Sequence, residues 1–141
     1  LFFSANELSK VGFIPWFSHT IATSLHCLSW GLVLAILCVF YFYIHYLFAS
    51  GTAHVSAMYG ALLGVAIAAG APATMSALML GYTASLFSST THYASGSASA
   101  MFGSGFIDKK DRWKMNFILG IVYLIIWIGF GSLWMKIIGL W

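Results

Sequence analysis

Two clusters of small polar residues interrupt long apolar stretches of this sequence. One is Ser50-Gly51-Thr52, and the other lies within residues 85–99, SLFSSTTHYASGSAS, where eight residues are Ser or Thr. Helices that begin just after the clusters, near Ala53 and near Ser97 or Ala98, would present free N–H groups able to hold a carboxylate. Freed main-chain carbonyls and hydroxyls would suit Na⁺, a hard cation that prefers oxygen ligands. The alternative is that the hydroxyls only cap helix ends.

Three histidines, His45, His54 and His92, lie beside these clusters. An ionisable side chain within membrane-embedded sequence is a functional candidate, because its burial in lipid is costly. The rings could donate to an anion, order the nearby backbone by hydrogen bonds, or simply pack. A metal or haem site is a further alternative, although the sequence contains no HExxH motif. We expect His19 and His26 at the membrane interface.

The charge content places both clusters in a membrane protein. Only nine of the 141 residues are Asp, Glu, Lys or Arg, whereas hydrophobic residues make up 61%. Residues 11–107 contain no formal charge, so this portion has no carboxylate proton relay. The composition excludes a soluble enzyme, a disordered chain and a nucleic-acid binder. The absence of a GxSxG motif and of a phosphate-binding Gly-rich loop disfavours an intramembrane hydrolase.

The apolar blocks predict an all-α, multi-pass protein of an inner or plasma membrane. The break at 50–52 carries no charge and is short, which favours a re-entrant hairpin over two spans in series. The hydroxyl-rich stretch predicts a broken helix. Unwound backbone at membrane depth is tolerated only where protein or water surrounds it, so the two breaks together indicate a transporter's binding site. The cationic segment 108–114 predicts a cytoplasmic loop before the last span.

Two motif regions resemble a known transporter family. HYLFASGTAHVSAMY (45–59), THYASGSASAMFGSGFI (91–107) and the ending WMKIIGLW (134–141) resemble the C-terminal region of the divalent anion/sodium symporter family. The similarity is strongest to its branch of 2-oxoglutarate/malate translocators and citrate/succinate antiporters. The chain opens with Leu1 rather than Met, so we expect the missing N-terminal half of the transporter to lie upstream.

The resemblance implies the second of two inverted repeats, which is the C-terminal half of a transport domain (21–141). Its parts would be an interfacial arm helix within 1–20, a hairpin (24–69), a broken helix (72–107) and a last span (113–138). The family's Ser-Asn-Thr signature stands here as Ser50-Gly51-Thr52, which loses the amide and keeps backbone donation. Where the family has a Thr-Pro-type element, this chain has Ser95-Gly96.

The expected site residues follow from the clusters and the resemblance. The candidates for substrate binding are Ser50, Gly51, Thr52, His54, His92, Ser95, Gly96 and Ser97. Backbone and hydroxyl oxygens at Ala49, Gly51, Ala94 and Ser95 are the candidates for sodium binding.

The expected function is secondary transport of di- or tricarboxylate anions of the 2-oxoglutarate, malate, succinate or citrate type. It would proceed by sodium symport or anion exchange with elevator-like alternating access. No cofactor is expected beyond Na⁺ as a coupling ion. The expected partners are a small carboxylate anion, membrane lipid and a second copy in a homodimer, with no nucleic acid. Alternatives are an inorganic divalent anion carrier, such as one for sulfate, and a haem- or quinone-binding membrane subunit.

Overall fold

The computed structural model describes residues 29–48, 50–88, 90–106 and 108–141, which form helices and connecting turns without a strand. The prediction of an all-α protein is confirmed for this part of the chain. Within it, three helices are long and apolar enough to cross a membrane, Trp30–Leu47, Gly51–Ala68 and Lys109–Ile137. The expected arm within 1–20, the start of the hairpin before residue 29, and Ala49 lie outside the described residues.

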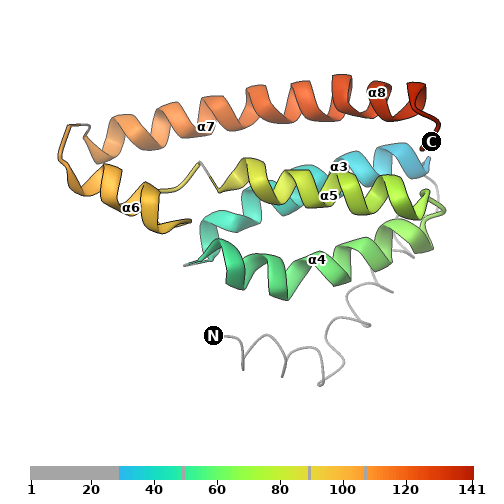
Figure 1. The fold of residues 1–141 in the computed structure, drawn as a ribbon, viewed down its shortest axis with the longest axis horizontal. Coiled ribbons are helices and arrows are strands. Elements are labelled where there is room, and N and C mark those ends of the chain that lie inside the picture. Colours follow the sequence, from blue (N-terminus) through green and yellow to red (C-terminus); the bar gives the residue numbers. More distant parts are fainter. Residues whose placement is uncertain (1–28, 49, 89, 107) are drawn as a thin grey trace.

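Three helices form the packed centre of the molecule (Figure 1). The first, α3 (Trp30–Ile44), continues into a 3₁₀ turn, η1 (His45–Leu47), and is followed by α4 (Gly51–Ala68) and α5 (Ala73–Phe87). Each of these three helices contacts the other two. Their shared core is apolar and includes Val33, Leu34, Leu37, Leu62, Val65, Met75, Met79, Leu80 and Phe87.

A tight turn joins α4 to α5. Gly70 adopts a left-handed conformation with φ of 87°, which costs a glycine little because it has no Cβ. The Ala71 N–H donates to Ala66 O at 3.1 Å and the Gly70 N–H donates to Ile67 O at 2.9 Å, so the last carbonyls of α4 are satisfied. Pro72 then follows and cannot continue the helix. The turn reverses the chain and lays α5 against α4.

The broken helix consists of α5, a non-helical stretch and a short helix, α6 (Gly96–Gly103). The helices after the two polar clusters begin earlier than expected, at Gly51 instead of near Ala53 and at Gly96 instead of near Ser97. The reason is the same in both places. The preceding serine is extended, which makes it the N-cap, and the glycine after it tolerates the first helical position.

The last helix runs as α7 (Lys109–Ile125), a π-helical segment η2 (Ile126–Gly131) and α8 (Ser132–Ile137). The expected loop at 108–114 is therefore wrong in conformation. Its lysines and arginine form the first turns of α7, because Asp108 takes the N-cap position and straight-chain cations are good helix formers. The cytoplasmic placement of this cationic end stays a prediction.

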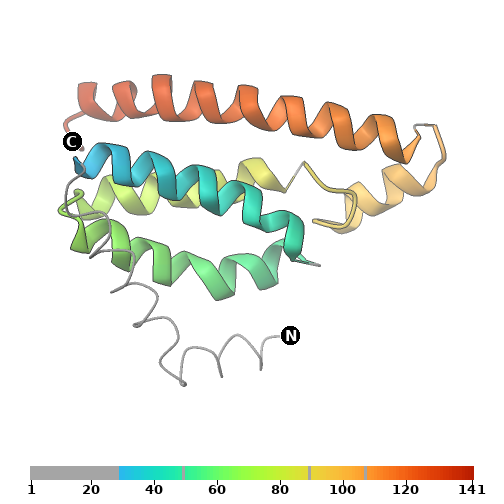
Figure 2. The same ribbon diagram turned by 180° about the vertical axis from the view of Figure 1, so that it is seen from behind.

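The last helix lies on the side of α3 and α5 that faces away from α4 (Figure 2). It approaches α3 closely at Gly120, where a Cβ would lie 2.7 Å from Phe42 Cε1. The Trp127 indole N–H donates to Met79 O at 3.2 Å and holds the helix to α5. Its other faces expose large apolar side chains, among them Ile118, Ile125, Phe130 and Ile137. This apolar exterior suits a helix that faces lipid or another membrane-embedded segment.

Candidate functional site

The hairpin tip lies where η1 turns into α4. Phe48 and Ser50 are extended, and the helix begins at Gly51. The Ser50 side chain makes no capping hydrogen bond, although serine at this position usually accepts one from the first turn. The Ser50 hydroxyl is therefore not committed to the helix start, and Thr52 beside it is exposed.

The start of α6 differs because its serine is engaged. The Ser95 hydroxyl accepts a hydrogen bond from the Ala98 N–H at 3.3 Å, which caps the helix. The Ser99 hydroxyl donates to His92 O at 2.8 Å and thereby ties α6 to the non-helical stretch. The sequence leaves open whether the hydroxyls only cap helix ends, and the structure shows that Ser95 does cap α6.

The two helix starts meet. The Gly51 N–H donates to Ala94 O at 3.4 Å, which joins the hairpin tip to the non-helical stretch. Both views of the ribbon place the first turn of α4 beside the first turn of α6 (Figures 1 and 2). The contact is tight for a side chain at Gly51, because a Cβ there would lie 3.2 Å from Ala94 O, which would have to shift by a few tenths of an ångström. Two positive helix ends therefore point into one region without any Lys or Arg between residues 11 and 107.

Open space adjoins this junction. Gly96, Ser97 and Thr52 are exposed, while Ser50 and Ser95 are half-buried. A Cβ at Gly96 would meet no atom within 4 Å, in contrast to Gly51. A small ligand placed here would meet first-turn N–H groups and hydroxyls.

Two histidines lie buried behind the tip. His45 and His54 have no exposed surface, and their ring centroids are 5.3 Å apart. His45 Nε2 lies 3.1 Å from the Thr91 hydroxyl oxygen, a second link between hairpin and non-helical stretch. Within the described part of the chain neither ring nitrogen of His54 has a hydrogen-bond partner. His54 instead packs against the aromatic rings of Tyr41, Phe48 and Phe87.

His92 belongs to a different group. Its ring contacts Tyr93, Phe102 and Trp113, which places it between the non-helical stretch, α6 and the start of α7. The structure therefore gathers Ser50, Gly51, Thr52, Ala94, Ser95, Gly96 and Ser97 at the junction. His54 lies beneath it and His92 lies to one side, and both rings pack against aromatic side chains.

Two residues that sequence reasoning does not single out complete the junction. Thr91 binds His45, and the Asn116 side-chain amide donates to Thr90 O at 2.7 Å, which fixes the non-helical stretch to α7. Thr91 lies 46 positions from its partner and Asn116 lies 26 positions from its own. Such pairs leave no local periodic signal. Among the described residues, no group of three or more His, Cys, Asp or Glu side chains could hold a metal ion.

Comparison with known proteins decides the family. The family model described as the sodium:sulfate symporter transmembrane region matches residues 1–141. The chain belongs to this sodium:sulfate symporter family. The resemblance drawn from the motifs at 45–59 and 91–107 is thereby confirmed, and the three helices long enough to cross a membrane agree with the prediction of a multi-pass membrane protein.

The relatives are carriers of organic anions. A Bacillus subtilis (strain 168) protein whose name assigns it to malate transport is 48% identical over 137 residues, 97% of this chain and 29% of its own length. The chloroplastic dicarboxylate transporter 2 of Spinacia oleracea is 42% identical over 139 residues, 97% of this chain and 25% of its own length. The L-tartrate/succinate antiporter of Escherichia coli (strain K12) is 34% identical over 135 residues, 95% of this chain and 28% of its own length.

The chain thus spans about a quarter of the length of the relatives it matches. Their names support transport of small dicarboxylates within the family.

Proposed function

We propose that this chain supplies one half of the substrate site of a secondary transporter for dicarboxylate or tricarboxylate anions. The observation that carries the proposal is the junction of the two helix starts, at which the Gly51 N–H meets Ala94 O. Helix N-termini attract anions through their free N–H groups and their partial positive charge. One carboxylate of the substrate would lie against Ser50, Thr52 and the first turn of α6.

Sodium would bind to oxygen atoms at the same junction, whereas the anion would bind to its N–H groups. Ala94 O accepts a long hydrogen bond from Gly51 and has a second lone pair, and the Ser95 and Ser97 hydroxyl oxygens lie 3.1 Å from each other. Such neutral oxygens are ligands that a hard cation accepts. The family description, which names sodium, supports Na⁺ as coupling ion. Anion exchange is the alternative, supported by the antiporter among the relatives.

The rest of the transporter would complete this half-site. The second carboxylate would meet an inverted copy of the hairpin and broken helix elsewhere in the whole transporter, and the two copies would move together against a scaffold in a homodimer. Inverted repeats with discontinuous helices at the midplane are a common transporter design. In this proposal the cationic end of α7 lies on the cytoplasmic side.

Uptake by the whole protein in proteoliposomes tests the proposal. Radiolabelled succinate and malate should enter when Na⁺ is present outside, or when the vesicles are preloaded with a dicarboxylate. Unlabelled sulfate should compete weakly. Uptake of radiolabelled sulfate with little dicarboxylate uptake would favour the inorganic-anion carrier that the family description also allows. Uptake of neither anion under either condition would refute the function.

A further inference from the structure

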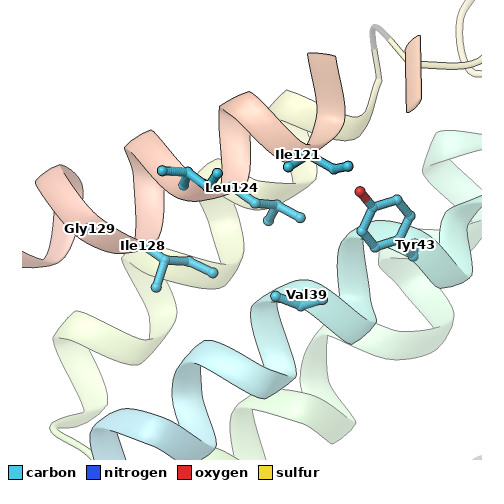
Figure 3. A pocket seen from close by; sticks show the side chains of 7 residues that line it. Val39, Tyr43, Ile121, Leu124, Ile128 and Gly129 are labelled. Carbon is cyan, nitrogen blue, oxygen red and sulfur yellow. The ribbon is translucent and has the colours of Figure 1, made fainter. Parts of the chain in front are cut away.

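A groove between α3 and the last helix lies away from the substrate junction. It has a volume of about 360 Å³ and is lined by Val39 and Tyr43 of α3 and by Ile121, Leu124, Ile125, Ile128 and Gly129 of the last helix (Figure 3). Apart from Tyr43, its lining side chains are aliphatic. Within the described part of the chain the buried Tyr43 hydroxyl has no hydrogen-bond partner.

Basic side chains near the start of α7 lie on the same helix face as this groove. In a helix with 3.6 residues per turn, positions 110, 114, 121 and 125 of α7 fall close to one face. Lys110 and Lys114 therefore share the face of α7 that carries Ile121 and Ile125 into the groove. Lys109 and Arg112 add charge at the same end, and with Asp108 and Asp111 the segment keeps a net positive charge. The groove is thus apolar along its length, and the lysines lie beyond its end on the same helix face.

The length of the last helix from Lys114 to the inner end of the groove matches the thickness of one bilayer leaflet. Lys114 and Gly129 are fifteen positions apart, which corresponds to about 22 Å of helical rise. A bilayer is about 40–45 Å thick with its headgroups, so this is about half of it. A cationic end at headgroup depth and an apolar groove at acyl-chain depth are therefore continuous on one helix face. The π-helical segment η2 closes the inner end, where Gly129 offers no side chain and a Cβ would meet nothing within 4 Å.

We propose that this groove is a binding site for an anionic phospholipid, whose phosphate lies at Lys110 and Lys114 and whose acyl chain lies between α3 and the last helix. The charge complementarity selects an anionic headgroup, and the aliphatic lining selects an acyl chain over a polar segment. The lipid would brace the last helix, which contacts α3 and α5 through few side chains, against the packed centre of the molecule.

Native mass spectrometry of the whole protein tests the site. The protein is delipidated in detergent and offered an equimolar mixture of phosphatidylglycerol and phosphatidylcholine with the same acyl chains. The parent protein should retain phosphatidylglycerol preferentially. Lys110→Gln/Lys114→Gln should lower this retention about tenfold or more, since each cation near the headgroup contributes substantially to binding. Lys109→Gln is the matched control, because it removes the same charge from a different face and should leave most of the retention.

A second variant separates the acyl chain from the headgroup. Gly129→Leu should fill the inner end of the groove and lower the retention of both lipids, while the thermal unfolding temperature stays near that of the parent protein. Equal retention of both lipids by the parent protein would overturn the proposal, and it is also the result expected if another segment of the protein or a second copy fills the groove. A phosphatidylglycerol preference that neither Gly129→Leu nor the double lysine variant changes would overturn it as well. The dicarboxylate function does not enter this test.

Discussion

At the hairpin tip, α4 begins at Gly51 after a serine whose side chain caps nothing, whereas α6 begins at Gly96 after a serine that caps its helix. The two glycines differ as well. Gly51 is buried against Ala94 O, and Gly96 faces open space. At Ser50-Gly51, the Gly51 N–H binds Ala94 O across the junction, and the Ser50 hydroxyl makes no capping hydrogen bond. At Ser95-Gly96, the Ser95 hydroxyl caps α6, and open space adjoins Gly96. The similar sequence patterns Ser-Gly-Thr and Ser-Gly-Ser therefore differ in which residue stabilises the fold. In the first it is the glycine, and in the second it is the serine; the other residue of each pair is the one available to a ligand.

The largest effect is expected at Gly51. In Gly51→Val the new Cβ would lie 3.2 Å from Ala94 O, so the tip has to move away from the non-helical stretch. Overpacking of this kind costs about 1–3 kcal/mol. We expect both a lower thermal unfolding temperature and a loss of dicarboxylate uptake by the whole protein in proteoliposomes. An unchanged unfolding temperature would show that the junction is looser than the Gly51–Ala94 contact indicates.

Gly96→Val separates ligand space from protein packing. A Cβ at this position meets no described protein atom within 4 Å, so the unfolding temperature should stay close to that of the parent protein. Uptake should nevertheless fall severely, because the side chain occupies the space proposed for the anion. Gly64→Val is a suitable control, since Gly64 is also exposed, lies in α4 and has open space around its Cβ position. Uptake by Gly96→Val at the parent level would exclude a site at the start of α6.

The sequence predicts the breaks better than the contacts between them. Hydroxyl-rich, charge-free sequence around Ser50 and before Gly96 indicates where helices end, because such residues favour caps and turns over helix interiors. The loop predicted at 108–114 is wrong because a run of charges is typical of a loop and equally of an exposed first helical turn, and here it begins α7. The π-helical segment leaves no sequence pattern that we recognised.

The contacts within the candidate site depend on tertiary structure. The bond from Gly51 to Ala94 and the approach of His45 to Thr91 join residues more than forty positions apart. Only the packing of α3, α4 and α5 brings them together. Local sequence therefore indicates which residues are polar in an apolar setting. It does not indicate which of them are available to a ligand and which bind other protein groups. Ser50 and Ser95 show this, because only the Ser95 side chain caps its helix.

The link between His45 and Thr91 should have an intermediate effect. Thr91→Val keeps the shape and removes the hydroxyl, which leaves His45 Nε2 without its partner. Loss of a hydrogen bond of this kind costs about 1 kcal/mol, so we expect the apparent KM for succinate to rise about fivefold. Thr91→Ser should restore it. Thr83→Val is the matched control, since the Thr83 hydroxyl is buried and donates to Met79 O within α5. An equal rise in KM for the Thr83 variant would assign the effect to general destabilisation.

The smallest and most discriminating effects are expected at the two serines. Ser95→Ala removes the hydroxyl that accepts from the Ala98 N–H, and loss of such a cap typically costs about 1 kcal/mol of stability. Ser50→Ala removes a hydroxyl that caps nothing, so it should leave the unfolding temperature unchanged. If the Ser50 hydroxyl binds the carboxylate, its removal raises the KM for succinate several-fold, whereas Ser95→Ala changes the KM less. Thermal unfolding and uptake kinetics measured on both variants check this crossed pattern. A Ser50→Ala protein that loses stability and keeps its KM would show that the tip hydroxyl supports the fold, and the difference between the two helix starts would then not extend to the ligand.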